Sequence, residues 1–379
     1  MSVTMRSLET AVPATTLHQA EVRDALAGQP DRSRLGKRLV AAAFDSSGIE
    51  RRHSALTEWD GPSADGDSVF FDAETGRFLN PTTGVRNQVY EREATALSLR
   101  VADQALRNAE GLGPADVTHV LTVSCTGFFS PGPDYRIVRA LGLAPSVQRY
   151  HLGFMGCYAA LPALRQAQTI CRADPDAVVL VVSVELCTLH VSTSDDPDTI
   201  VGSSLFSDGA AAAVVTGRDL PSSTPLLRLD HFETVLTPVG EEAMAWNIGD
   251  HGFEMVLGTY VPHIIDEHIT GALEPLLAHE PELAQRPRRD IEHWAIHPGG
   301  RSILDKVESK LDLTGPQLVP SRETLRDFGN MSSATVLFVL QRILRAAVAG
   351  REERVCAMAF GPGLTVETAL LTTVGVPDS

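Results

Sequence analysis

Three short motifs, far apart in the sequence, contribute a thiol, an imidazole and a carboxamide. They are Gly156-Cys157-Tyr158, Ala295-Ile296-His297-Pro298-Gly299-Gly300 and Gly329-Asn330-Met331-Ser332-Ser333. A cysteine nucleophile needs a base or a cation that favours its thiolate, and an oxyanion that develops on a thioester needs hydrogen-bond donors. Together the motifs indicate acyl transfer on a cysteine, and we predict that Cys157, His297 and Asn330 are catalytic.

The context of Cys157 supports a role as nucleophile. The run Gly153-Phe154-Met155-Gly156 precedes it and an Ala/Leu-rich helical pattern follows. This places the thiol at or near a helix N-terminus, where the partial positive charge favours thiolate over thiol. A single cysteine is more often a small buried apolar residue, and only the other two motifs reverse that interpretation.

His297 and Asn330 each have a structural alternative. His297 ends an apolar strand before a Pro-Gly-Gly loop, where sites are commonly built, but a histidine there can also be a core residue. Asn330 precedes an apolar helix and can be its N-cap. Ser332 or Ser333 can cap that helix equally well, which leaves the Asn330 amide available as an oxyanion donor beside the imidazole.

The elements that must position these motifs alternate between strands and helices. Apolar runs predict buried strands over His119–Cys125, Ala177–Glu185, Ala210–Thr216, Trp294–His297 and Val355–Phe360. Helical spacing of apolar residues predicts helices over Ala94–Ala109, Tyr158–Cys171 and Ala334–Ala347. Because strands alternate with helices, we expect a layered α/β architecture. The breaker-rich segment Thr216–Pro225 predicts a linker between two halves.

Composition excludes several classes of partner. The chain has 379 residues, 43% of them hydrophobic, and a formal net charge of −16. That charge argues against nucleic acid and anionic membrane as main partners. The five cysteines have neither zinc-like nor disulfide-like spacing, so we expect reduced thiols in a cytoplasmic protein. We see no signal peptide and no apolar stretch long enough to predict a transmembrane helix.

Six ordered motifs resemble those of the type III polyketide synthases, the chalcone synthase superfamily, over nearly the whole chain. They are Val123-Ser124-Cys125-Thr126-Gly127, Met155-Gly156-Cys157, Leu205-Phe206-Ser207-Asp208-Gly209-Ala210-Ala211, His297-Pro298-Gly299-Gly300, Gly329-Asn330-Met331-Ser332-Ser333 and Phe360-Gly361-Pro362-Gly363-Leu364-Thr365-Val366-Glu367. The resemblance implies a thiolase-like five-layer αβαβα fold of two similar halves, residues 1–220 with the nucleophilic cysteine and residues 221–379 with the histidine and asparagine. It also implies a homodimer.

The resemblance assigns roles to these residues. Cys157 would carry the starter and the growing chain, while His297 and Asn330 would decarboxylate malonyl-CoA and hold the thioester oxygen. Phe206 matches an aromatic gatekeeper between the CoA tunnel and the cavity, and either Phe253 or Met255 matches a second gatekeeper. The loop Gly361-Pro362-Gly363 would shape the cavity. The substrates would be acyl-CoA and malonyl-CoA, with no cofactor, metal or carrier protein.

The predicted cavity residues indicate a subgroup. They are Cys125, Thr126, Ser130, Cys187, His190, Phe206, Met255, Ser332, Gly361 and Pro362. Ser130 and Cys187 are smaller than the residues of plant members, which resembles bacterial enzymes that make alkylpyrones or alkylresorcinols from long fatty acyl-CoA. A buried alkyl chain gains about 0.8 kcal/mol per CH2. The alternative is that neighbouring side chains fill the space. Trp246 is a further candidate for the lining.

Candidate ligands of the CoA phosphates do not match plant members position by position. We expect other basic residues to replace them: Lys37, Arg38, Arg51, Arg52 and Arg301. Arginine suits phosphate well, although each of these side chains can equally be a solvated surface charge.

Several alternatives remain open at this stage. Cys125 matches a second cysteine of tetrahydroxynaphthalene synthases, which use malonyl-CoA alone. An initiating ketoacyl carrier-protein synthase also uses Cys, His and Asn, but would show a His-Gln-Ala-Asn stretch and a basic docking surface. A papain-like hydrolase and a non-catalytic thioester-binding homologue are weaker alternatives, because the motif context differs from the first and no member of the triad is lost as in the second.

Overall fold

One large sheet organises the structure, a computed structural model that describes residues 2–60, 68–258 and 260–375. The sheet has nine strands in the order β13-β14-β15-β10-β1-β9-β8-β6-β7. Their bounds are Thr4–Ala11 (β1), His119–Ser124 (β6), Gln148–Gly153 (β7), Val178–Leu186 (β8), Asp208–Thr216 (β9), Leu226–Leu236 (β10), His293–Ile296 (β13), Glu352–Gly361 (β14) and Thr365–Val374 (β15).

Shorter elements surround this sheet. Three two-stranded sheets pair Thr15–His18 (β2) with Arg51–Ser54 (β3), Phe71–Asp72 (β4) with Arg77–Phe78 (β5), and Met244–Gly249 (β11) with Gly252–Leu257 (β12). The α-helices are Gln19–Ala27 (α1), Arg34–Ser46 (α2), Thr83–Asn108 (α3), Pro133–Ala140 (α4), Ala160–Ala173 (α5), Pro197–Leu205 (α6), Val261–Leu277 (α7), Pro281–Ala284 (α8), Arg301–Leu311 (α9), Gly315–Phe328 (α10) and Thr335–Arg345 (α11). Short 3-10 turns are Thr57–Asp60 (η1), Pro114–Asp116 (η2), Cys187–His190 (η3), Glu241–Ala243 (η4), Arg288–Asp290 (η5), Ser332–Ala334 (η6) and Pro362–Leu364 (η7).

The strand order repeats within the sheet. In the N-terminal part, β6 and β8 are parallel, and β8-β9 and β9-β1 are antiparallel. In the C-terminal part, β13 and β14 are parallel, and β14-β15 and β15-β10 are antiparallel. The two parts join where Thr4 and Met5 of β1 pair with Arg228 and Leu227 of β10. The expected two similar halves are therefore present and continuous in one sheet, and only the N-terminal half has an extra edge strand, β7.

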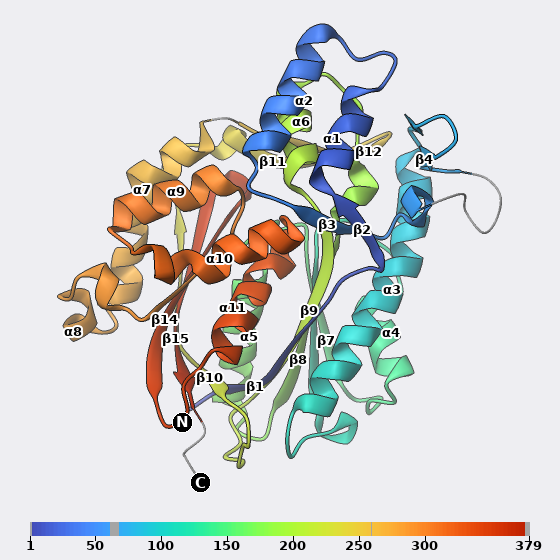
Figure 1. Cartoon of the computed structure of the whole chain (residues 1–379). Helices are drawn as coiled ribbons and strands as arrows, with labels where there is room; N and C mark the ends of the chain where they lie inside the picture. Colours follow the sequence, from blue (N-terminus) through green and yellow to red (C-terminus); the bar gives the residue numbers. More distant parts are fainter. Residues whose placement is uncertain (1, 61–67, 259, 376–379) are drawn as a thin grey trace.

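The helices divide the molecule into five layers. Helices α5 and α11 lie between the two halves of the sheet, and their buried faces share one core cluster with β1, β6, β8, β14 and β15 (Figure 1). Helices α3 and α4 pack on the outer face of the N-terminal strands. Helices α7, α9 and α10 pack on the outer face of the C-terminal strands. This arrangement confirms the αβαβα fold predicted from the sequence.

Most predicted elements are present, with shifted bounds. The largest difference is α3, which begins at Thr83 instead of Ala94. Its first two turns bury Arg86 and Tyr90, and a buried arginine interrupts the apolar pattern on which the prediction depended. The predicted linker connects β9 to β10, and residues 217–225 form neither helix nor strand.

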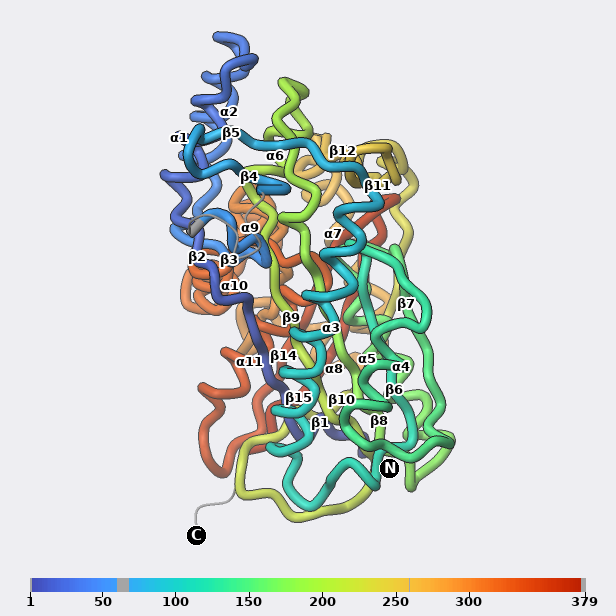
Figure 2. The backbone as a smooth tube through the Cα atoms, turned by 90° about the vertical axis from the view of Figure 1, so that its right-hand side faces the viewer, coloured from blue at the N-terminus to red at the C-terminus, as the bar shows by residue number. Residues whose placement is uncertain are grey.

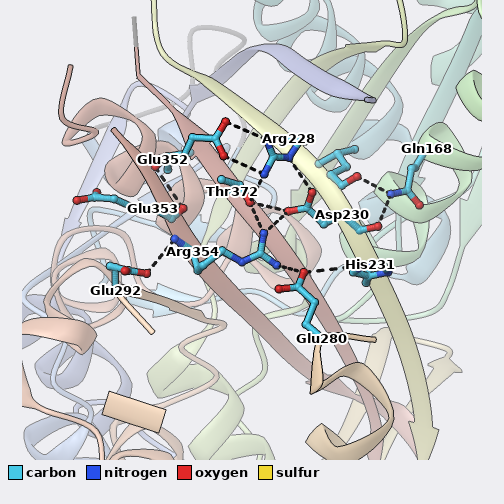
Figure 3. Close-up of polar contacts among 12 residues, drawn as sticks. Gln168, Arg228, Asp230, His231, Glu280, Glu292, Glu352, Glu353, Arg354 and Thr372 are labelled. Carbon is cyan, nitrogen blue, oxygen red and sulfur yellow. Dashed lines mark hydrogen bonds and ion pairs between the residues drawn. The ribbon is translucent and has the colours of Figure 1, made fainter. Parts of the chain in front are cut away.

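A charged cluster ties the C-terminal strands together, away from the motifs discussed above (Figure 3). The Asp230 carboxylate on β10 accepts from Arg228 Nε at 2.9 Å, Arg354 Nη1 at 2.8 Å and Thr372 Oγ1 at 2.7 Å. Arg228 also pairs with Glu352, and Arg354 with Glu280. Asp230 therefore links β10, β14 and β15 through a half-buried charge network.

The loops that follow β6 and β13 lie at the same end of the sheet, and the chain termini lie at the opposite end. Figure 2 shows α1, α2, α6 and the β4-β5 and β11-β12 pairs gathered above this end. A separate apolar cluster that includes Leu17, Val22 and Phe44 anchors the cap formed by α1 and α2. No helix among the described residues combines the length and apolar character needed to cross a membrane.

Candidate active site

The three predicted catalytic side chains meet at this end of the sheet, and each comes from a different loop. Cys157 lies in the turn before α5, His297 follows β13, and Asn330 follows α10. All three line one cavity, the inner chamber. Cys157 Sγ lies 4.0 Å from Asn330 Oδ1. The juxtaposition on which the sequence interpretation depended is therefore present.

Glycines at two positions allow the loops to approach one another. Gly156 has φ +77°, and a Cβ there would lie 2.4 Å from Pro362 Cδ. Gly361 has an extended backbone, but a Cβ would lie 2.5 Å from Tyr158 Cδ1 and 3.4 Å from the Cys157 nitrogen. Both Cβ positions are occupied, so any side chain would push the Gly361-Pro362 loop away from the Cys157 turn.

Burial affects the thiol and the imidazole in opposite directions. It raises the pKa of Cys157 to about 11 and lowers the pKa of His297 to about 3. The helix N-terminus therefore does not by itself ionise the thiol as expected, and α5 begins at Ala160, three residues after Cys157. Burial disfavours either charge alone. One proton transfer from Sγ to the imidazole creates both charges together and leaves the net charge of the chamber unchanged.

Neither ring nitrogen of His297 has a hydrogen-bond partner among the described residues. A neutral imidazole has one N–H donor and one nitrogen acceptor. Unpartnered polar groups that are 1% exposed are costly, and they are typical of sites that bind a ligand. His297 is therefore free both to accept a proton and to donate a hydrogen bond.

Asn330 uses the two ends of its carboxamide for different contacts. Its Oδ1 accepts from the Ser332 backbone N–H at 2.9 Å, in a local turn at the start of η6. Its Nδ2 donates a long hydrogen bond of 3.4 Å to the Gly299 carbonyl, in the loop after His297. The N-cap residues of η6 and α11 are Met331 and Ala334, and neither helix has a side-chain cap from the described residues. The capping role considered for Asn330, Ser332 or Ser333 is therefore absent, and Asn330 Nδ2 remains a donor.

A second thiol in the inner chamber belongs to a buried network that sequence reasoning missed. Cys125 Sγ lies 3.3 Å from Ser332 Oγ, and the Cys125 N–H donates to the Glu185 carboxylate at 3.0 Å. Glu185 also accepts from Thr126 Oγ1 at 2.9 Å and from Ser333 Oγ. Burial raises the pKa of Glu185. The signal that could have revealed it is a carboxylate inside the otherwise apolar run that forms β8.

A second cavity, the outer chamber, adjoins the first and shares part of its lining. Four side chains line both chambers: Cys187, Phe206, Trp246 and Met255. Phe253 lines only the outer chamber, where it stacks on His190. Of the two residues considered for the second gatekeeper, Met255 is therefore the one that lines both chambers, as Phe206 does.

His190 holds the wall between these chambers in place. Its Nε2 lies 2.8 Å from the Thr126 carbonyl, and its Nδ1 accepts from the Phe253 N–H at 3.0 Å. Burial lowers the pKa of His190 to about 3. A neutral ring that donates at Nε2 and accepts at Nδ1 satisfies both contacts, so His190 is a structural tie between η3 and the β11-β12 hairpin.

Ser130 is exposed and lines neither chamber of its own chain. The resemblance places it where a partner subunit contributes a residue, so its role stays a prediction. Arg52, predicted to bind CoA phosphate, is 3% exposed, and its Nη1 donates to the Ser203 and Phe206 carbonyls. Its Nη1 thus bonds the backbone next to the first gatekeeper, while its Nε has no partner in the described part of the chain. Arg52 therefore positions Phe206 and does not face solvent phosphate.

The other predicted phosphate ligands are exposed. Lys37 and Arg38 lie on α2, Arg51 precedes Arg52 on β3, and Arg301 begins α9. Arg51 Nη2 lies 3.6 Å from Asp327 Oδ1, and Arg301 Nε lies 3.7 Å from Asp305 Oδ2. These four side chains reach solvent, where a CoA phosphate could contact them, and their role in phosphate binding stays a prediction.

The described part of the chain contains no cluster of three or more metal-ligating side chains. The inner chamber instead combines thiols, one imidazole, one carboxamide and apolar walls from Met244, Leu257, Ile303 and Phe360. Such a chamber can hold an acyl group on sulfur and stabilise negative charge on one oxygen.

Comparison with known proteins supports this assignment of the chemistry. Residues 2–219 match the N-terminal domain of chalcone and stilbene synthases, and residues 229–375 match their C-terminal domain. The chain is 33% identical over 300 residues to type III polyketide synthase 10 of Oryza sativa subsp. japonica, covering 76% of this chain and 74% of the relative. It is 30% identical over 366 residues to probable polyketide synthase 1 of Dictyostelium discoideum, covering 96% of this chain but 11% of that protein.

Solved structures of type III polyketide synthases are similar to this chain over nearly its whole length. PKS-I from the brown alga Ectocarpus siliculosus superimposes with a TM-score of 0.88 at 28% identity, covering 98% of both chains. The C-terminal type III polyketide synthase domain of Steely1, a type I/III hybrid from Dictyostelium, gives a TM-score of 0.87 at 27% identity, covering 99% of this chain and all of that domain.

Proposed function

Because the chain belongs to the chalcone and stilbene synthase family, and is thus a type III polyketide synthase, we propose that it extends a long-chain fatty acyl-CoA starter with malonyl-CoA. The extended chain then cyclises to an alkylpyrone or alkylresorcinol. The observation that carries the choice of starter is the outer chamber, whose lining is partly aromatic and aliphatic and which adjoins the inner chamber at Cys187. An alkyl chain that leaves the acyl carbonyl at Cys157 has space to extend there.

The proposed loading step uses the thiol and the imidazole. The Cys157 sulfur attacks the thioester carbonyl of acyl-CoA while His297 accepts the thiol proton. The tetrahedral intermediate collapses, the bond to the CoA sulfur breaks, and the CoA thiolate leaves with the proton from His297. The acyl group then remains on Cys157. The opposite pKa shifts of the two groups suit this role, because neither holds a charge alone in the buried site.

The proposed extension step uses the imidazole and the amide. The thioester oxygen of malonyl-CoA accepts from a His297 N–H and from Asn330 Nδ2, so that loss of carbon dioxide leaves an enolate on an oxygen with two donors. The enolate carbon attacks the acyl carbonyl on Cys157 and expels the sulfur, and the extended chain is then carried by CoA. Asn330 Nδ2 can serve here because the contact with the Ser332 N–H uses only Oδ1.

We assign supporting roles to the remaining residues. Phe206 and Met255 line both chambers and so control the passage between them, and Gly361 and Pro362 shape the wall beside Cys157. Lys37, Arg38, Arg51 and Arg301 bind CoA phosphates from the exposed surface. Residues 1–220 and 221–379 are the two halves of the enzyme, which agrees with the repeated strand order.

We also propose a homodimer in a reducing, cytoplasmic environment. The strand β7 ends the sheet, and the exposed side chains near it include Phe128, Tyr135 and Tyr150. An unpaired edge strand with exposed aromatic residues is a typical association surface. All five cysteines are free thiols. Light scattering of the purified protein tests the dimer directly.

The test of function is incubation with malonyl-CoA and a series of acyl-CoA starters from acetyl to stearoyl, followed by mass spectrometry. We expect alkylpyrones or alkylresorcinols from the long starters. A product from malonyl-CoA alone would instead support a tetrahydroxynaphthalene-type synthase, for which the buried Cys125 beside Ser332 is the favouring observation.

A further inference from the structure

Three aromatic rings from the segment between β3 and α3 form the far wall of the outer chamber. Trp59, Phe71 and Phe78 all line it, and we call them the aromatic wall. Their ring centroids are 4.6 Å apart between Trp59 and Phe71, 5.0 Å between Phe71 and Phe78, and 6.0 Å between Trp59 and Phe78. The rings present a continuous apolar surface toward the chamber, since each of them contacts it.

Two polar side chains hold the aromatic wall in position. The Glu58 carboxylate is 7% exposed and accepts from the backbone N–H groups of Val69, Phe70 and Phe71 at 2.8, 2.7 and 2.8 Å. Gln29 accepts from the Phe78 N–H at 3.1 Å and donates to the Gly76 carbonyl at 2.9 Å. These contacts fix the backbone on both sides of the β4-β5 pair. The wall is thus built into the fold from the turn after α1 and from η1.

The charges around the outer chamber favour an uncharged occupant. Arg52 is the one arginine or lysine among the described lining residues; its Nη1 donates to two backbone carbonyls, and its Nε has no partner. Glu254 also lines the chamber and would repel a phosphate. His190 is neutral because burial lowers its pKa to about 3. A CoA diphosphate therefore meets a single buried cation and a carboxylate among these described residues, whereas an alkyl chain meets the aromatic wall.

We propose that the aromatic wall binds the methyl end of the acyl chain and thereby selects long linear starters. This proposal rests on the proposed function, because it requires the acyl carbonyl at Cys157 and the chain passing Cys187 into the outer chamber. A short starter does not reach the wall, so only long starters gain from it. Each buried methylene contributes a factor of about four in binding.

Starter profiles of variants provide the first test. Phe71→Ala and Glu58→Gln should lower kcat/KM for hexadecanoyl-CoA by roughly tenfold, with a change of less than about twofold for butanoyl-CoA. Tyr260→Ala, which removes an aromatic ring that is 67% exposed and outside both chambers, is the control and should leave both values unchanged. Equal losses for short and long starters would overturn the proposal.

A binding measurement separates this proposal from the function it rests on. In a Cys157→Ser variant, terminally brominated hexadecanoyl-CoA should quench tryptophan fluorescence, and Trp59→Phe should remove most of that quenching. An analogue brominated on the third carbon should not depend on Trp59. If wild-type enzyme makes no product from hexadecanoyl-CoA, the starter assignment fails. If Trp59→Phe leaves the terminal quenching intact, the aromatic wall proposal fails even though product forms.

Discussion

Trp246 donates its indole N–H to the Cys125 carbonyl over 2.7 Å, and this bond holds the β11-β12 hairpin over both chambers. The next carbonyl along the chain, that of Thr126, contacts His190 Nε2 at 2.8 Å. Two successive carbonyls after β6 are therefore tied to the wall that separates the chambers. The shape of that wall depends on these contacts as well as on side-chain size.

Replacing Trp246 with phenylalanine should test this tie. The change removes the N–H but keeps an aromatic ring, so it leaves the Cys125 carbonyl without its partner at a cost of about 1 kcal/mol. We expect a small loss in the free energy of unfolding and a broader distribution of product chain lengths, measured by mass spectrometry. An unchanged product distribution would show that the hydrogen bond does not control the chamber.

Replacing Cys157 with alanine should separate the two half-reactions. Chain extension should fall by roughly three orders of magnitude or more because no acyl group can be held, while carbon dioxide release from malonyl-CoA persists through His297 and Asn330. Cys171→Ala, a buried cysteine of α5 outside both chambers, is the matched control. Full polyketide output from the Cys157 variant would contradict the assignment of the nucleophile.

Replacing Cys187 with tryptophan should block the passage between the chambers, because Cys187 lines both. We expect loss of long starters and retention of acetyl to hexanoyl starters in a competition assay with mixed acyl-CoAs. Thr126→Phe, which alters the inner chamber only, should reduce activity with short starters too. Unchanged use of stearoyl-CoA by the Cys187 variant would refute the path of the alkyl chain.

Acid should destabilise the fold through its buried neutral histidines. The folded pKa of His297 is about 3 and the unfolded value is about 6.5, so below pH 6.5 the unfolded chain binds a proton that the folded chain does not. The contribution of neutral His297 to the free energy of unfolding is fully present above pH 6.5 and is lost as the pH falls toward 3. At pH 5 the loss is about 2 kcal/mol for this group. Urea unfolding at pH 7 and pH 5 should show a smaller fall in the free energy of unfolding for His297→Gln than for the unmodified protein. An equal fall in both proteins would contradict this role of His297.

The network in Figure 3 makes a prediction about stability alone. Asp230 is 14% exposed and holds two arginines, whereas Glu352 is 57% exposed and contacts one of them. Asp230→Ala should cost about 2–4 kcal/mol because it leaves Arg228 and Arg354 without their shared carboxylate. Glu352→Ala should cost less than about 1 kcal/mol. Comparable losses in the two variants, measured by chemical denaturation, would show that burial does not decide the strength of this network.

Much of the fold followed from the sequence because its central strands are buried on both faces. The apolar runs that form β6, β8, β9, β13 and β14 are nearly continuous. Such strands can be predicted from their own sequence, without knowledge of the strands beside them. The strand β7 has exposed residues over most of its length, and the first turns of α3 bury Arg86. Pattern alone does not identify either of these elements, since burial there depends on neighbours far along the chain.

The catalytic candidates Cys157, His297 and Asn330 could also be predicted from the sequence, because each lies in a glycine-containing motif typical of such sites. Only the tertiary structure decided what their surroundings do to them. It buries the thiol and imidazole so that their pKa values move apart, and it turns Arg52 inward onto backbone carbonyls. It also brings Trp59, Phe71 and Phe78 to one wall and places Glu185 behind Cys125. Burial and long-range contact set charge and shape, and neither is a property of a short stretch of sequence.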